Sequence, residues 1–167
     1  PSDHTTTWPP SPTRVALAGR TDSGVHARGQ VAAFSAETWH EAETVRKALN
    51  AALPEDVAIR ATRAVPLDFD PRRWARKRWY RYTIANGEAR DPLARRAAWF
   101  IGANLDLQAM QQAAGAIAGT RDFIACSGPL EPGRTSVRTV FNAGWRSEGC
   151  TLLFDIEADA FLPQMVR

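Results

Sequence analysis

Hydrophobic and polar residues follow regular periods along most of the chain after residue 13, and these periods predict short strands separated by helices. A period of two is typical of a half-buried strand, and apolar residues three to four positions apart indicate a helix. Strands are expected over residues 14–18, 29–35 and 57–65. Ala42, Val45 and Leu49 recur at helical spacing before Pro54, which predicts a helix that ends there.

The second half of the chain shows the same alternation more clearly. Residues 79–84 place three apolar or aromatic side chains on one face, Tyr80, Tyr82 and Ile84, and three others on the opposite face, Trp79, Arg81 and Thr83. A helix is expected from its N-cap Asp106 to Gly119. Strands over 137–145 and 151–158 flank a turn at residues 147–149, which predicts a hairpin, and residues 161–167 are interpreted as the opening of another helix.

These elements predict an α+β protein with a mixed, mostly antiparallel sheet and flanking helices. Residues 1–13 carry three threonines in a row and four prolines without periodicity, and we expect an irregular leader. Residues 14–66 have the order strand, strand, helix, strand, as a ferredoxin-like half that lacks its first strand and helix would have. Residues 67–167 are expected to form a second half.

Composition restricts the class of protein. The chain has 167 residues, 44% of them hydrophobic, which can bury one sizeable core or two small ones. It has no apolar stretch near 18 residues and no charged segment followed by an apolar one at its start, so neither a membrane span nor a signal peptide is expected, and the cytoplasm is the expected location. The two cysteines, Cys126 and Cys150, and three scattered histidines predict no disulfide and no metal site.

Positive charge is concentrated in one segment. The net charge of the chain is +3, but residues 60–96 hold eleven Arg or Lys residues and four acidic ones, which gives this segment +7 and the rest of the chain −4. One basic face in an otherwise acidic molecule is typical of a protein that binds a polyanion. The alternative is an arginine-rich surface that is only solvated.

The most informative polar stretch is residues 19–30, a glycine-rich turn between two predicted strands. Asp22 lies there among Arg20, His26 and Arg28. Nearby positive charge keeps a carboxylate ionised, as a nucleophile requires. The same residues also suit an ordinary turn, in which Asp bonds to its own backbone and Gly takes a left-handed conformation. The spacing fits neither a dinucleotide-binding fingerprint nor a P-loop.

A family resemblance distinguishes these two interpretations. Residues 19–27, Gly-Arg-Thr-Asp-Ser-Gly-Val-His-Ala, resemble the signature of the TruA family of tRNA pseudouridine synthases. The likeness continues in order through further motifs, at residues 50–57, 69–72, 78–82, 122–123, 134–135 and 161–167. It covers about residues 14–167. The family's usual first strand and helix, and its continuation after Arg167, have no counterpart, so an incomplete chain is expected.

The resemblance implies a pseudouridine synthase fold and the isomerisation of uridines 38–40 in the tRNA anticodon stem-loop, with no cofactor and a homodimeric enzyme. It places the catalytic aspartate at Asp22 and the active-site tyrosine, which would stack on the base, at Tyr80. Arg167 matches the family arginine that would pair with the aspartate. Whether Asp22 attacks the base, attacks the ribose or acts as a base stays open.

Other residues are expected to bind the RNA. Arg20 would help to hold the target nucleotide outside the stem, and His26 and Arg28 would position phosphates, although His26 suits a hydrogen bond within its own loop equally well. Aromatic rings interleaved with arginines over 78–82 suit unstacked bases and phosphates, although in a typical sheet a tyrosine face is more often simply part of the core. The predicted substrate-binding residues are Arg20, Thr21, His26, Arg28, Arg72, Arg78 and Arg81. Two alternatives to the enzyme are a non-catalytic RNA-binding module of the same fold and a scaffold in which the Asp22 turn is only a turn.

Overall fold

A computed structural model describes residues 13–166 of the chain. The chain divides into two compact units. The first contains the residues up to Arg20 and Arg28–Trp74, and the second contains Thr21–Ala27 and Ala75–Arg167. Each unit is described by itself below.

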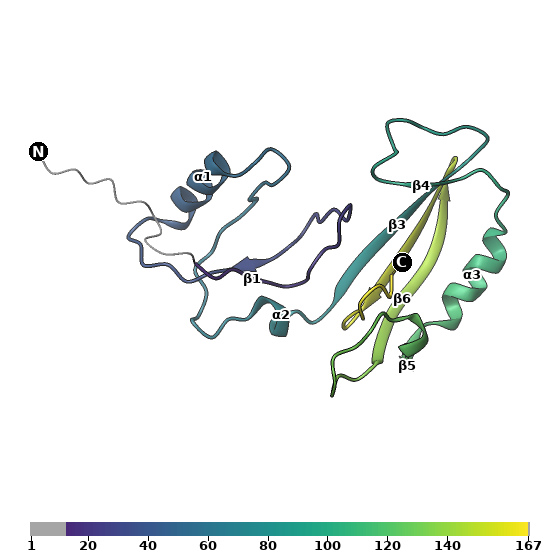
Figure 1. Ribbon diagram of the computed structural model, residues 1–167. Coiled ribbons are helices and arrows are strands. Elements are labelled where there is room, and N and C mark those ends of the chain that lie inside the picture. The colour runs from purple at the N-terminus through teal and green to yellow at the C-terminus, as the bar shows by residue number, and fades with distance from the viewer. Residues whose placement is uncertain (1–12, 167) are drawn as a thin grey trace, which may run out of the picture. The chain divides into compact units, whose positions relative to one another are not determined.

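The first unit is built from two short strands and two helices (Figure 1). The strands β1 (Ala16–Leu17) and β2 (Ala32–Ala33) pair antiparallel inside the two predicted strand regions but are shorter than expected. Helix α1 (Ala42–Ala52) confirms the helix predicted before Pro54. It buries none of its residues, and among the described residues of this unit only Pro71 is buried.

The strand predicted over residues 57–65 is wrong, because none of these residues is in a strand. The side-chain amide of Asn50 forms the backbone hydrogen bonds at Ile59 that a partner strand would otherwise form. Its Nδ2 donates to the carbonyl of Ile59 (2.9 Å), and its Oδ1 accepts from the N–H of the same residue (2.7 Å). The Thr62 hydroxyl donates to the carbonyl of Ala42. Side chain and backbone of α1 therefore take the place of a partner strand.

A short helix, α2 (Pro71–Trp74), follows Asp70. Asp70 caps it, because its Oδ1 accepts from the N–H groups of Arg72 (2.8 Å) and Arg73 (3.1 Å). These N–H groups of Arg73 and Arg72 hold the pKa of Asp70 below its ordinary value. An Asp followed by Pro at the first helical position is a helix-start signal that was present in the sequence.

The second unit contains a five-stranded sheet in the order β4-β3-β7-β6-β5. Its strands are β3 (Arg78–Asn86), β4 (Trp99–Ile101), β5 (Gly119–Asp122), β6 (Val137–Glu148) and β7 (Thr151–Ala158). All neighbouring pairs are antiparallel except β3 and β4. Figure 1 shows the long strands β3, β6 and β7 side by side with helix α3 (Leu107–Ala116) next to them. The predicted α+β class with a mixed, mostly antiparallel sheet is confirmed.

The predicted hairpin and the predicted alternation in β3 are both present. Strand β6 extends beyond residue 145 to Glu148, and Gly149 turns the chain into β7 with a φ of +60°. Tyr80, Tyr82 and Ile84 pair with Ile156, Phe154 and Leu152 of β7 on one face of the sheet. The register of β6 against β7 shifts between Val140 and Asn142, which leaves Phe141 as an exposed bulge residue.

The core of the second unit lies on the Tyr80 face of the sheet. Its buried side chains are Phe123, Val140, Ile156, Ala158 and Leu162. Phe161, Met165 and Val166 pack against this cluster, so the final residues contribute to the core. They form a turn instead of the predicted helix, because Met165 N–H bonds back to Leu162 (3.2 Å) and Gln164 has a φ of +64°.

Helix α3 begins as predicted, because the Asp106 carboxylate accepts from the N–H of Ala109 (3.0 Å). Its Ile117 end packs against the core cluster. Gln111 reaches the neighbouring strand β6, where its Oε1 accepts from the N–H of Trp145 (2.6 Å). Strand β5 pairs only with the first part of β6, up to Val140, so Gln111 caps a stretch of open strand edge.

No helix within residues 13–166 combines the length and the apolar composition that a membrane crossing requires.

Candidate functional site

The Asp22 loop connects β1 to β2, and a glutamine side chain closes its base. Gln30 Nε2 donates to the carbonyl of Gly19 (2.6 Å), and its Oε1 accepts from the N–H groups of Gly19 (3.3 Å) and Val31 (3.2 Å). Ala18 N–H also bonds to the Val31 carbonyl (2.9 Å). These bonds hold the two ends of the loop together and leave residues 20–30 exposed.

Asp22 begins a tight turn at the tip of this loop. The N–H of Val25 donates to the Asp22 carbonyl (3.0 Å), and Gly24 at the third position has a φ of +82°. A type II turn requires this positive φ, which glycine adopts without strain. The predicted turn chemistry is therefore present. Its side chains Thr21, Asp22 and His26 are solvent-exposed, which allows a large substrate to approach them.

The compact unit that contains Thr21–Ala27 also contains β3, the strand that carries Tyr80, Arg78 and Arg81. The predicted residues Arg20, Arg28 and Arg72 belong to the other unit. Arg167, predicted as the partner of the Asp22 carboxylate, lies outside the described residues. Asp22 and Tyr80 are thus grouped in one unit although they are 58 positions apart in the sequence.

Tyr80 lies on the core face of the sheet and remains half-buried. It pairs with Ile156 of β7, and its ring meets the ring of Phe161 edge to face, with 4.9 Å between ring centroids and an interplanar angle of 86°. The ring is therefore held in one orientation by packing, while part of it stays accessible. This position suits both a core residue and a ring that stacks on a base at the edge of the core.

Arg78 precedes Tyr80 on the same face and contacts the chain just after β7. Its Nη1 donates to the backbone carbonyl of Asp159 (2.9 Å), and the residue is half-buried. Asp159 in turn accepts from Thr139 N–H (3.1 Å) and Ala160 N–H (2.6 Å) through its carboxylate. Arg78 therefore lies in an ordered polar network at the end of the sheet near the core.

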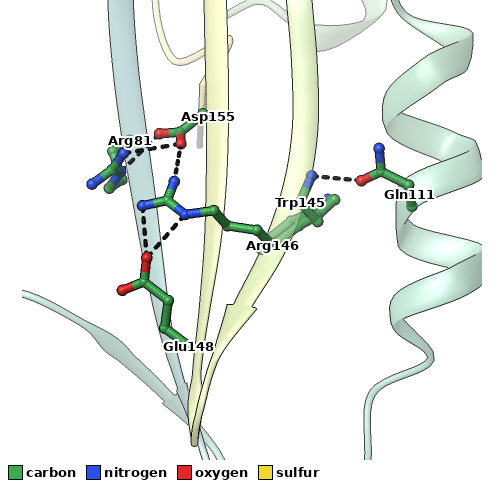
Figure 2. Close-up of polar contacts among 6 residues, drawn as sticks. All are labelled: Arg81, Gln111, Trp145, Arg146, Glu148 and Asp155. Carbon is green, nitrogen blue, oxygen red and sulfur yellow. Dashed lines mark hydrogen bonds and ion pairs between the residues drawn. The ribbon is translucent and has the colours of Figure 1, made fainter.

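Arg81 lies on the opposite face of the sheet and is bound to a carboxylate (Figure 2). Its Nε and Nη2 donate to the two oxygens of Asp155 at 2.8 and 3.0 Å. Arg146 donates to the same Asp155 (2.6 Å) and to Glu148 (3.0 Å). The hydrogen bonds that Arg81 donates to Asp155 raise the pKa of Arg81 above its ordinary value. The Arg81 guanidinium also lies 4.8 Å from the ring centre of Trp79, which is 52% exposed.

Two hollows lie beside the loop between β3 and β4, at the end of the basic segment 60–96, where the sequence predicted no individual binding residue. The first is lined by Arg90, Arg95, Trp99 and Phe100 together with small residues. The signal that could have found it is the pair of arginines followed closely by two aromatic residues.

The described residues contain no group of three or more His, Cys, Asp or Glu side chains that could hold a metal ion. Cys126 and Cys150 are both exposed and unbridged.

Comparison with known proteins gives consistent matches. The family model described as tRNA pseudouridine synthase matches residues 3–72. A tRNA pseudouridine synthase A of Citrifermentans bemidjiense is 42% identical over 149 residues, which cover 89% of this chain and 60% of that protein. The protein of the same name from Roseiflexus castenholzii is 44% identical over 161 residues, 92% of this chain and 58% of that protein. That from Geotalea uraniireducens is 40% identical over 156 residues, 93% of this chain and 64% of that protein. The chain thus spans about three fifths of the length of these curated relatives.

Proposed function

Because the chain belongs to the tRNA pseudouridine synthase A family, we propose that the full-length protein converts uridine to pseudouridine in tRNA. The observation that supports this most directly is the exposed turn at Asp22, which belongs to the same compact unit as the half-buried Tyr80. We propose uridines 38–40 of the anticodon stem-loop as the targets, and a homodimer in the cytoplasm as the working form.

The reaction rearranges one nucleotide without net oxidation or reduction. The bond from ribose C1′ to N1 of uracil breaks, the base rotates, and C1′ joins C5. The C5 proton leaves to solvent and N1 gains a proton. A carboxylate that adds to the nucleotide and leaves again, or that takes and returns a proton, supplies the catalysis that these steps need. Asp22 is the carboxylate proposed for this role, and no cofactor is required.

An ionised carboxylate in a site that excludes water needs a cationic partner, because burial alone raises the pKa of an acid. Arg167 is the residue proposed as this partner, on the strength of its position in the final motif. Tyr80 is proposed to stack on the uracil after the nucleotide leaves the stem, which recovers part of the cost of unstacking. Arg20, Thr21, His26, Arg28, Arg72, Arg78 and Arg81 are proposed to contact the RNA.

Release of tritium from C5 of labelled uridine tests this function, since C5 loses its hydrogen only when the new bond forms. The full-length protein is expected to release tritium from tRNA labelled at uridines 38–40 and not from tRNA in which these positions are cytidine. Binding of tRNA without release would identify a non-catalytic RNA-binding protein. Absence of both binding and release would contradict the proposal altogether.

A further inference from the structure

The loop between β3 and β4, residues 87–98, lies at one end of the sheet (Figure 1). It borders two adjoining hollows of about 310 and 390 Å³. Both hollows share walls made of small and polar residues, Ala85, Asp91, Ala94 and Ala98. The first hollow adds Arg90, Arg95, Trp99 and Phe100 to these walls. Its size is in the range of small-molecule sites, and its lining combines flat rings with guanidinium groups.

Hydrogen bonds fix the shape of this loop. Asn86 Nδ2 donates to the carbonyls of Ile101 (2.7 Å) and Ala103 (2.8 Å), which joins the start of the loop to the strand that follows it. Within the loop, Asp91 Oδ1 accepts from Leu93 N–H (2.8 Å), and the Ala94 carbonyl accepts from the N–H groups of residues 97 and 98 (both 2.9 Å). The hollow is therefore formed by a structured loop before any ligand binds.

The aromatic wall presents its rings in fixed positions. Trp99 is 58% exposed, and its ring meets Tyr82 edge to face with 6.4 Å between centroids. The Arg90 guanidinium lies 5.5 Å from the centre of the Phe100 ring. A guanidinium stacked on a ring keeps its N–H donors directed outward in its own plane, where a phosphate can accept them in pairs.

The arginines of this hollow differ from those on the sheet. Arg81 and Arg146 are bound to Asp155, so their charge is largely neutralised. Within residues 13–166, by contrast, no carboxylate forms an ion pair with Arg90, Arg95 or the neighbouring Arg96. Asp91 is the one acidic side chain in the first hollow, and its Oδ1 is engaged by the backbone of Leu93.

We propose that this hollow binds one unstacked nucleotide of the RNA, with the base against Trp99 and the flanking phosphate at Arg90 and Arg95. Exposed aromatic rings bind bases by stacking, and unpaired guanidinium groups bind phosphates. This inference rests on the proposed function, because it takes the substrate to be RNA. It adds a contact outside the Asp22 turn and the arginines of β3.

The test measures tRNA affinity of the full-length protein by fluorescence anisotropy over a range of salt concentrations. The double variant Arg90→Gln, Arg95→Gln is expected to bind about tenfold more weakly. Its slope of log Kd against log salt concentration is expected to fall by about 1 to 2. Each lost phosphate contact lowers this slope by roughly 0.7–0.9, and the variant lacks two arginines. The control is Arg96→Gln, which removes one positive charge from the same loop at a residue that lines neither hollow, and it is expected to bind within about twofold of wild type.

A second pair of variants separates stacking from stability. Trp99→Phe keeps an aromatic ring against Tyr82 and is expected to keep most of the affinity, whereas Trp99→Leu is expected to lose about tenfold. Circular dichroism checks that each variant is folded, and Trp39→Leu is the control for loss of an exposed tryptophan outside the hollow.

Wild-type binding and turnover separate the two proposals. If wild type releases tritium from tRNA while the Arg90, Arg95 variant binds tRNA with unchanged affinity and unchanged salt slope, the nucleotide site is wrong and the proposed function stands. If wild type binds no tRNA, both proposals are wrong. If the variant instead changes only the self-association of the protein in light scattering, the hollow is a protein interface and the nucleotide site is again wrong.

Discussion

Arg81 of β3 and Asp155 of β7 are direct cross-strand partners and form a two-point ion pair. The Nε–Oδ1 distance is 2.8 Å and the Nη2–Oδ2 distance is 3.0 Å. Arg146 binds the same carboxylate from β6, so one half-buried Asp155 holds two guanidinium groups in place. An arginine whose donors are fixed in this way has fewer of them left for an RNA phosphate. Arg90 and Arg95, which form no ion pair with any carboxylate of residues 13–166, keep more of their donors available for that role.

Asp155→Asn is expected to lower the free energy of unfolding by about 1–2 kcal/mol, because it weakens charge-assisted hydrogen bonds to both Arg81 and Arg146. Urea unfolding of the full-length protein measures the effect. The control is Glu131→Gln, which breaks a surface pair with Arg134 (3.1 Å) whose carboxylate is 79% exposed and is expected to cost less than about 0.5 kcal/mol. Equal losses in the two variants would contradict the role given to Asp155.

Gln111→Leu is expected to lower the free energy of unfolding by about 1 kcal/mol, because the N–H of Trp145 loses its acceptor at an open strand edge. Hydrogen exchange at the Trp145 amide is expected to become faster in this variant. The matched control is Gln112→Leu, the neighbouring exposed glutamine of α3, which leaves the Trp145 bond intact. Unchanged exchange at Trp145 in Gln111→Leu would show that this bond does not protect the strand.

Asp122 is expected to stabilise the fold in a pH-dependent way. Hydrogen bonds from the Ser136 side chain and from Ile124 N–H lower its pKa below the ordinary value of 3.8. A folded-state pKa below the unfolded one gives stability that is present above the ordinary value and is lost as the pH falls through the lowered pKa. Carboxyl NMR titration is expected to show this low pKa in wild type and a higher one in Ser136→Ala. The same value in both would disprove the assignment of the cause.

Tyr80 is expected to contribute to turnover as well as to packing of the core. Tyr80→Leu is expected to slow tritium release about tenfold or more, because it removes the ring proposed to stack on uracil. Phe161→Leu is the matched control, since it removes the same edge-to-face contact and leaves the tyrosine in place. Equal turnover in these two variants, each corrected for the folded fraction, would return Tyr80 to a purely structural role.

Local patterns predicted the second unit well. Strands β3, β6 and β7 and helix α3 carry their periodicity, N-cap and turn residues within the segment itself, and each formed where expected. Strand β5 has the sequence Gly-Thr-Arg-Asp, which shows no alternation, and it exists because it pairs with β6. Residues 57–65 show the reverse case. Their pattern is typical of a strand, but the backbone of Ile59 hydrogen-bonds to the side chain of Asn50 and pairs with no strand.

The candidate site was predictable only in its local parts. The turn at Asp22 follows from its own residues, because Asp and Gly suit its first and third positions. The pairing of Arg81 with Asp155 joins residues 74 positions apart and depends on the register of β3 against β7, which sequence spacing does not define. The hollow at Arg90 likewise depends on how Asn86 closes a loop onto Ala103.

Tritium release by the Asp22→Ala variant of the full-length protein measures whether the Asp22 carboxylate carries the chemistry. Release from tRNA is expected to fall by about a thousandfold or more, while tRNA affinity stays within about threefold, because backbone contacts dominate binding. Asp56→Asn, an exposed acidic residue in a different turn, is the control and is expected to turn over tRNA as wild type does. Turnover in Asp22→Ala equal to that of Asp56→Asn would contradict the account.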